Sequence, residues 1–389
     1  MASEQLTVVV APDSFKGSLP ADEAAAAMAR GARAVLGPGA TVLERPLADG
    51  GEGTLDVLLA VWGTEPVEVG TVDAIGRPRT GRYGISPDGR TALIEAAEGN
   101  GLPHVSDVPL QPLRADSHGV GLIARALLDR PESTDLQEVL LCVGGSASTD
   151  GGTGLLTGLG ARFLDADGQP VEPGGQGLGA IHAIDQDALH PRARQVDWRI
   201  AVDVDNPACG PRGAAAVFGP QKGASPEDVP VLDAGLAHLA GVLAAITGND
   251  PEQLRTAPGL GAAGALPLAA STLLGARLRP GAELVADAVG LREALATADV
   301  VLTGEGSLDE QSLGGKVVDA VRRTAPEGCA VVVLAGRVAL DAAACREAGI
   351  TAALSIAPGP APLEDLVARA PELLEDAAAH ACALLVRRA

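Results

Sequence analysis

One loop of the chain combines glycines, hydroxyls and a carboxylate in a way that suits anion binding. The stretch VGGSASTDGGTGLLT (143–157) follows the apolar run EVLLCV and leads into a helix-like segment. Glycines let the backbone approach a ligand closely, and amides at the start of a helix attract anions. The stretch therefore predicts a phosphate-binding nest, whose candidate donors are Gly144, Gly145, Ser146, Ser148 and Thr149.

Other loops of similar composition also follow predicted strands. In an open α/β sheet, ligands bind beyond the carboxyl ends of the strands, so these loops are candidate ligand-binding segments. Their candidate residues are Asp13, Ser14 and Lys16 in APDSFKGS, Asp49, Gly50, Gly51 and Glu52 in ADGGEGT, Asp203 in AVDVDNP, and Gly304, Glu305 and Lys316 in TGEGSLDEQSLGGKV.

Lysine is rare in this chain and occurs only beside glycine. Lys16, Lys222 and Lys316 are the only lysines among 29 basic residues. The lysine ammonium is a compact point charge that suits phosphate oxygens. Carboxylates beside such a nest would repel phosphate unless Mg²⁺ lay between them, because Mg²⁺ binds one or two carboxylates together with phosphate oxygens. Glycines, acids and rare lysines therefore predict Mg-nucleotide binding.

Familiar alternatives fit the sequence poorly. GxxxxGK[ST] does not occur, and GEGSLD has only the first two glycines of a dinucleotide fingerprint. The six histidines show no metal-ligand spacing, and GxSxG is absent around VGGSAST, which disfavours a hydrolase.

Composition limits the partners and the compartment. A net charge of −21 disfavours nucleic acid and anionic membranes, and 2% aromatic residues leave no platform for stacking bases. The five cysteines are scattered, and the N-terminus lacks the pattern of a signal peptide, so we expect a cytoplasmic protein. The apolar window 229–248 contains Asp233 and His238 and suits a packed helix.

Apolar runs predict buried strands near 6–12, 41–47, 138–145, 299–306, 330–336 and 352–358. Capping and charge signals predict a helix over 19–37. Alternating residues with turn signals predict an antiparallel meander over 66–97, which would join 138–145 and 198–204 in a mixed sheet. These patterns predict two α/β domains, with 66–289 inserted between 1–65 and 290–389.

Several of these motifs, in the same order, resemble the bacterial glycerate kinase family that phosphorylates D-glycerate at its 2-hydroxyl. The motifs are APDSFKGSL, PLADGGEGT, GGSASTDGGTG, DVDNPACGPRGAAAVFGPQKGA, GLGAAGAL and TGEGSLDEQSLGGK, spread over residues 7–356. The resemblance implies a flavodoxin-like parallel-sheet domain with an inserted mixed-sheet, restriction-endonuclease-like domain. It also implies ATP and Mg²⁺ in the cleft between them, with 2-phosphoglycerate and ADP as products.

Roles for individual residues follow as hypotheses. Asp150 or Asp203 would hold Mg²⁺, and Asp13 or Asp49 would accept the hydroxyl proton. Lys16 would neutralise the phosphoryl group or the substrate carboxylate, while Asp203 could also serve in catalysis. Phosphate binding would extend from the nest to Gly304, Glu305 and Lys316. Substrate contacts are expected from Ser14, Gly50, Gly51, Glu52 and Lys222.

Two departures from the family pattern affect substrate identity. The nest reads Ala-Ser-Thr-Asp where the family often has Ala-Thr-Asn-Asp. Ser307 stands where the family usually has Arg, which removes a possible phosphate or carboxylate contact. A kinase for another small hydroxy acid and a non-catalytic sensor of sugar acids are therefore the alternatives. We expect small-molecule partners, D-glycerate and ATP, and a monomer or homodimer.

Overall fold

The computed structural model describes residues 6–385, which divide into two compact units. Unit 1 comprises the chain up to Asp49, Asp56–Trp62 and the chain from Pro280 onward. Unit 2 comprises Gly50–Leu55 and Gly63–Arg279. The return to unit 1 falls at Pro280 rather than at the expected residue 290, because helix α10 (Gly281–Ala288) packs against helix α12 (Val317–Thr324).

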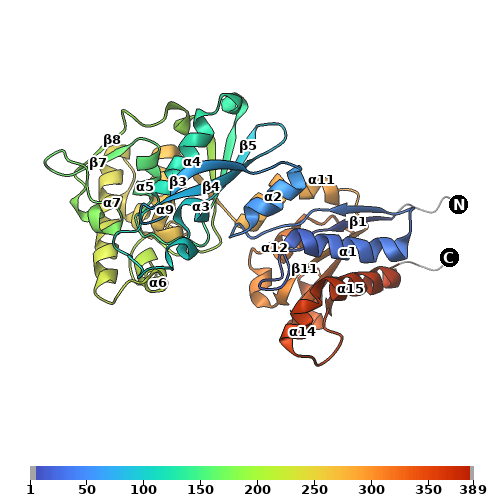
Figure 1. Cartoon of the computed structure of the whole chain (residues 1–389). Helices are drawn as coiled ribbons and strands as arrows, with labels where there is room; N and C mark the ends of the chain where they lie inside the picture. The colour runs from blue at the N-terminus through green and yellow to red at the C-terminus, as the bar shows by residue number, and fades with distance from the viewer. Residues whose placement is uncertain (1–5, 386–389) are drawn as a thin grey trace. The chain divides into compact units, whose positions relative to one another are not determined.

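Unit 1 is built on a parallel sheet of five strands (Figure 1). Their order is β13-β12-β11-β1-β2, and every neighbouring pair is parallel. Renumbered along the chain this is the order 2-1-3-4-5 of flavodoxin-like folds, as expected from the sequence. The strands are β1 (Thr7–Val10), β2 (Thr41–Glu44), β11 (Val300–Leu308), β12 (Ala330–Val338) and β13 (Ala352–Ser355).

Alternating side chains of this sheet enter two different cores. Val332 and Leu334 face the cluster that helices α1 (Ala21–Leu36) and α15 (Ala370–Leu385) cover, and these two helices lie side by side (Figure 1). Val333 and Ala335 face α12 and α13 on the other side. The remaining helices are α2 (Thr54–Trp62), α11 (Leu291–Leu295), α13 (Ala342–Glu347), α14 (Leu363–Ala368) and the 3-10 turn η6 (Glu310–Leu313).

Unit 2 contains the predicted mixed sheet. Its order is β10-β9-β6-β5-β4-β3, with antiparallel pairs from β3 to β5 and parallel pairs from β5 to β10. The strands are β3 (Val67–Val72), β4 (Pro78–Ile85), β5 (Thr91–Glu95), β6 (Glu138–Cys142), β9 (Asp197–Ala201) and β10 (Arg277–Arg279). The antiparallel meander is confirmed, but the short strand β10 and the β7–β8 hairpin (Arg162–Leu164, Ala183–Asp185) were not expected.

Helices cover this sheet with a single large core. The buried faces of β5, β6 and β9 meet residues of α4, α5 and α9 in one cluster. The helices are α3 (Ala97–Asn100), α4 (His118–Asp129), α5 (Thr153–Gly158), α6 (Ala214–Phe218), α7 (Asp228–Thr247), α8 (Pro251–Thr256) and α9 (Ala262–Leu274), with 3-10 turns η1 (Leu102–Val105), η2 (Pro131–Asp135), η3 (Gly175–Ala180), η4 (Pro191–Arg194) and η5 (Pro220–Lys222).

Helix α7 is the one described helix long and apolar enough to cross a membrane by length and composition. Its leucines Leu232, Leu236, Leu239 and Leu243 are fully buried, and the last three belong to the core cluster of unit 2. The helix therefore packs within the protein, as the polar residues in its sequence predicted.

Two helical glycines should respond in opposite ways to substitution by alanine. A Cβ atom at Gly31 in α1 would lie 2.0 Å from the carbonyl oxygen of Glu375 in α15. A Cβ atom at Gly241 in α7 would have no atom within 4 Å. Gly31→Ala should therefore destabilise the protein by about 1–3 kcal/mol, and Gly241→Ala should stabilise it by about 0.5–1 kcal/mol. Urea unfolding would measure both, and equal effects would contradict the close packing of α1 on α15.

Candidate active site

Three acidic residues lie beside one another in unit 1, although they come from distant parts of the sequence. The amide of Asp13 donates to the carbonyl of Gly304 at 2.8 Å, so the chain beyond β1 continues along β11. The amide of Leu47 donates to the carbonyl of Pro12 at 2.9 Å, which brings the chain beyond β2 to the other side. The carboxyl end of β1 thus brings Asp13 between Asp49 and Glu305.

Burial raises the pKa of Asp13 and of Glu305. Asp13 is 7% exposed, and its burial, followed by the nearby charge of Asp49, raises its pKa to about 7. The amide of Ser14, which donates to Asp13 Oδ1 at 2.6 Å, opposes that rise in pKa. Burial also raises the pKa of Glu305, against the attraction of Lys316 and Lys16. Within the described residues, Glu305 Oε1 is buried and has no hydrogen-bond partner.

The first loop presents a lysine to this cluster. Phe15 and Leu19 are buried and form a bridge across the loop, which leaves Lys16 at its tip. Lys16 Nζ lies 3.6 Å from Asp49 Oδ2, and its side chain is 80% exposed. Ser14 is half-buried in the same loop. The loop therefore combines a fixed backbone with a cation that is free to move toward a bound anion.

The late loop contributes less directly. Gly304 is buried, and a Cβ atom there would lie 2.0 Å from the carbonyl oxygen of Leu334, so packing between strands explains this glycine. Asp309 caps η6 by accepting from the amide of Gln311. Lys316 is the residue before α12, and its charge acts on Glu305. Of the three predicted phosphate contacts here, Glu305 and Lys316 lie in the acidic cluster of unit 1, not in the glycine nest.

In unit 2, the glycine-rich loop is organised around the buried carboxylate of Asp150. Asp150 is 0% exposed. Its Oδ2 accepts from the amide and hydroxyl of Ser117 at 2.9 and 2.7 Å and from the amide of Gly154 at 3.0 Å. Its Oδ1 accepts from the hydroxyl of Ser148 at 3.0 Å and the amide of Gly152 at 3.3 Å. The carboxylate thus satisfies the donors at the start of α5.

This geometry corrects two expectations. Asp150 does not fit the predicted Mg²⁺ site, because both of its oxygens are buried and hydrogen-bonded inside the protein. The amides of Gly152 and Gly154 at the start of α5 are not open to a phosphate, because they already donate to the carboxylate of Asp150. Helix α5 has only six residues, Thr153–Gly158, so its dipole is also small.

The exposed part of the loop is smaller than predicted. Ser148 and Thr149 are buried, and the hydroxyl of Ser148 accepts from Asn100 Nδ2 at 2.9 Å while donating to Asp150. Gly145 is exposed, Gly144 is half-buried, and Ser146 is 8% exposed. The accessible nest therefore consists of Gly144 and Gly145, with Ser146 at its inner edge.

The segment Gly50–Leu55 packs against this nest. A Cβ atom at Gly144 would lie 3.0 Å from Gly51 Cα, so a side chain here would force the two loops apart. The position of a Cβ atom at Gly145 lies 3.9 Å from Glu52 Oε2. The amide of Leu55 donates to the buried Glu95 Oε1 at 2.6 Å, which fixes the segment. Gly51, Glu52 and the nest therefore form one cradle.

Lys222 is buried and Asp203 is exposed. Lys222 is 3% exposed, and its Nζ donates to Ser146 Oγ at 3.0 Å and to the carbonyl of Ser148 at 2.5 Å. The predicted direct contact between Lys222 and substrate does not fit, because its ammonium faces the inner side of the loop. Asp203 is exposed beyond β9, where Asp205 pairs with Arg212.

Sequence reasoning missed the buried partners of these loops. Asn100, Ser117 and Glu95 each hold a loop of the candidate site by hydrogen bonds. Asp116 lies near Asp150, and burial followed by the charge of Asp150 raises its pKa to about 7. All four residues lie outside the five strand-end loops that the sequence singled out as candidate ligand-binding segments.

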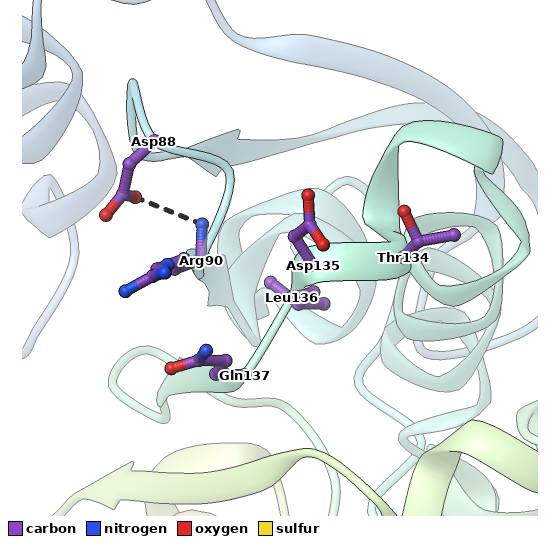
Figure 2. A pocket seen from close by; sticks show the side chains of 6 residues that line it. All are labelled: Asp88, Arg90, Thr134, Asp135, Leu136 and Gln137. Atoms are coloured by element: carbon purple, nitrogen blue, oxygen red, sulfur yellow. Dashed lines mark hydrogen bonds between the residues drawn. The ribbon is translucent and has the colours of Figure 1, made fainter.

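A polar hollow elsewhere in unit 2 lies at the wrong end of the sheet. Figure 2 shows its lining, in which Asp88 and Arg90 precede β5 and Thr134–Gln137 precede β6. The glycine nest follows the carboxyl end of β6, whereas this hollow is at the amino ends of the strands. It therefore does not belong to the cradle.

Within residues 6–385, no group of three or more His, Cys, Asp or Glu side chains has the arrangement of a metal site. A Mg²⁺ ion in a phosphoryl-transfer site needs fewer protein ligands, because the phosphates supply the others. The unpartnered Oε1 of Glu305, beside Asp13, is the group that best fits this requirement.

A flavodoxin-like unit with clustered acids and a mixed-sheet unit with a glycine cradle define a two-unit α/β enzyme with polar, anion-compatible loops. Comparison with known proteins identifies its family. The profile of the glycerate kinase family matches residues 8–386. The chain belongs to the glycerate kinase family.

Characterised relatives agree with this assignment. The chain is 39% identical to glycerate kinase of Bacillus subtilis over 95% of each chain, and 37% identical to glycerate 2-kinase of Escherichia coli over 90% of each. A crystal structure of a Salmonella typhimurium LT2 protein assigned as a glycerate kinase 2 superimposes with a TM-score of 0.87 at 37% identity, covering 98% of each chain. The identification of the family from its motifs is confirmed.

Proposed function

We propose that the protein transfers a phosphoryl group from ATP to the 2-hydroxyl of D-glycerate, giving 2-phosphoglycerate and ADP. The observation that carries this proposal is the buried carboxyl of Asp13, with Asp49, Glu305 and Lys16 around it. A hydroxyl nucleophile needs a base for its proton, and a base is most effective when its pKa lies near the working pH. Asp13, with a pKa of about 7, meets that requirement.

Asp49 and Lys16 assist in this proposal. Asp49 raises the pKa of Asp13 through repulsion, and Lys16 lies beside both carboxylates. An exposed lysine at a loop tip can follow a phosphoryl group at little cost, because its ion pair with Asp49 is long, at 3.6 Å, and the lysine side chain is 80% exposed. Phosphoryl transfer depends chiefly on alignment and neutralisation of charge, so a mobile cation and a fixed base supply complementary parts.

Glu305 is our candidate for holding Mg²⁺ in unit 1, and Asp203 is a second candidate in unit 2. When bound, Mg²⁺ would neutralise charge on the phosphates. A buried carboxylate oxygen without a donor is costly, and a cation would satisfy Glu305 Oε1. We further propose that the amides of Gly144 and Gly145 bind an anionic group, and that Glu52 accepts from a hydroxyl of the substrate.

The compartment and assembly follow the same proposal. None of the five cysteines, which all lie within residues 6–385, forms a disulfide, and this suits a reducing compartment such as the cytoplasm. Each unit contributes its cluster from a single chain, so a monomer or a homodimer would suffice.

The products distinguish the proposed reaction from its alternatives. With Mg-ATP and D-glycerate, we expect release of ADP and a ³¹P–¹³C NMR signature of 2-phosphoglycerate, with no turnover in excess EDTA. A panel of small hydroxy acids with the same assay tests acceptor identity. Formation of 3-phosphoglycerate would contradict the proposed transfer to the 2-hydroxyl. Faster turnover of another hydroxy acid would contradict D-glycerate as the acceptor. The second outcome is worth testing because Ser307 stands where the family usually has Arg.

Asp13→Asn should lower kcat about 10²–10⁴-fold, the usual contribution of a general base. In the unsubstituted enzyme, kcat should fall below about pH 7 as Asp13 gains its proton. Because the folded-state pKa of Asp13 is raised, its stabilising contribution is present below about pH 4 and is lost as the pH rises through about 7. Asp13→Asn should therefore be more stable than the unsubstituted protein at pH 8.

Asp49→Asn is the matched control for this assignment. It removes the charge that raises the pKa of Asp13, so the acid limb of the kcat profile should move to lower pH. If the acid limb persists unchanged in Asp13→Asn, or does not move in Asp49→Asn, another residue must be the base.

A further inference from the structure

Lys222 is a cation buried on the inner side of the glycine cradle in unit 2. It ends the 3-10 turn η5, and its ammonium reaches the loop at two points, the Ser146 hydroxyl and the Ser148 carbonyl. Ser146 directly follows the half-buried Gly144 and the exposed Gly145, the accessible residues of the nest. The ammonium therefore lies under the part of the loop that a ligand can reach.

Lys222 is costly to keep in this position. Burial lowers its pKa to about 7, and the carboxylate of Asp150 opposes that shift. Asp150 is not a direct partner of the ammonium, because its hydrogen bonds go to Ser117, Ser148, Gly152 and Gly154. A methionine of similar length would fill the same space without the cost of desolvating a charge.

The loop does not need Lys222 to keep its shape. The amide of Ala147 donates to the carbonyl of Asn100 at 2.8 Å, and the amide of Leu102 donates to the carbonyl of Gly145 at 2.8 Å. The amide of Gly151 donates to the carbonyl of Gly264 at 3.0 Å, within a left-handed turn formed by Ala263–Ala265. These contacts, with those of Asp150, already fix the loop from α3 and α9.

We propose that Lys222 is a positioning residue for the anion bound at Gly144 and Gly145: it orients the Ser146 hydroxyl and places a positive charge beneath the nest. The protein carries a net charge of −21, and Glu52 lies beside Gly145, so an anion approaching the cradle meets a negative field. A buried charge is screened little by solvent, and its attraction reaches the nest through the loop. This inference rests on the proposed function of the cradle as an anion site.

Lys222→Met tests the charge, with Thr71→Val as the matched control. The hydroxyl of Thr71 donates one buried hydrogen bond to the carbonyl of Gly119 at 2.7 Å, in the same unit but outside the cradle. We expect Lys222→Met to raise KM for ATP or for glycerate at least ten-fold with kcat changed less than three-fold. The KM that rises identifies the anion on the nest. Thr71→Val should lower the urea midpoint without changing either KM.

Equal kinetic behaviour of the two variants, or a fall in kcat without a rise in KM, would overturn the proposal. Titration calorimetry with inorganic phosphate and Mg-ADP at pH 6.5, where the amine is protonated, repeats the comparison without turnover. If the wild-type protein binds these anions but does not phosphorylate glycerate, the proposed reaction is rejected. The comparison of anion binding by wild-type protein and Lys222→Met still tests the role of Lys222. Unweakened binding of both anions by Lys222→Met, with an unchanged KM for glycerate, would reject the role of Lys222.

A second variant keeps the test decisive if Lys222→Met fails to fold. Ser146→Ala retains the buried ammonium and its bond to the Ser148 carbonyl, and should raise the same KM about three-fold or more. In Lys222→Ala, propylamine in the medium should restore anion binding, whereas propanol of equal size should not. An unchanged KM in Ser146→Ala, or equal rescue by the alcohol, would overturn the role of the charge.

Discussion

The buried carboxylate of Asp150 determines the structure of the glycine-rich loop. A loop with this many glycines has a high conformational entropy when unfolded, and ordering it needs specific contacts. Five donors from α4, α5 and the loop itself converge on the two oxygens of Asp150. The carboxylate thereby occupies the anion position at the start of α5, and the ligand-accessible amides are those that precede it, at Gly144 and Gly145.

Strand order plays the corresponding part in unit 1. Because β1 lies between β2 and β11 in a parallel sheet, the segment that follows β1 lies between the segment that follows β2 and the carboxyl-terminal half of β11, which contains Glu305. Asp13, Asp49 and Glu305 are therefore neighbours despite large separations in sequence. Burial, followed by repulsion from the neighbouring carboxylates, raises the pKa of Asp13 to about 7. This raised pKa is a property of the cluster rather than of any one loop. In the proposed function the two units therefore supply different chemistry, a proton acceptor from unit 1 and an anion cradle from unit 2.

The sequence predicted the elements better than it predicted the direction of side chains. Apolar runs and turn signals located the five strands of unit 1 and the meander of unit 2, because both patterns are local. Strand β10 escaped prediction, since three residues carry no periodic signal. Unit 1 resumes at Pro280, about ten residues before the expected 290, because α10 packs against α12, which no local pattern encodes.

The site was predicted at the level of loops and only in part at the level of residues. Asp150 and Asp13 look alike in sequence, as acids that follow a strand. The carboxylate of Asp150 is fully hydrogen-bonded inside the protein, whereas burial, followed by the charge of its neighbours, raises the pKa of Asp13. The difference arises from Ser117 and Gly154 on one side and from Asp49 and Glu305 on the other. Lys222 was recognised as unusual, but its inward orientation depends on η5 and could not be inferred from glycine neighbours alone.

The central claim is that the glycine loop is ordered by Asp150 before any substrate binds. Amide hydrogen exchange of the ligand-free protein tests this most directly, at Ser117, Gly152 and Gly154, whose amides donate to the carboxylate. We predict slow exchange at all three, accelerated at least 100-fold in Asp150→Asn and unchanged in the exposed control Asp205→Asn. Rapid exchange in the unsubstituted protein that slows only when Mg-ATP or glycerate is added would contradict the account.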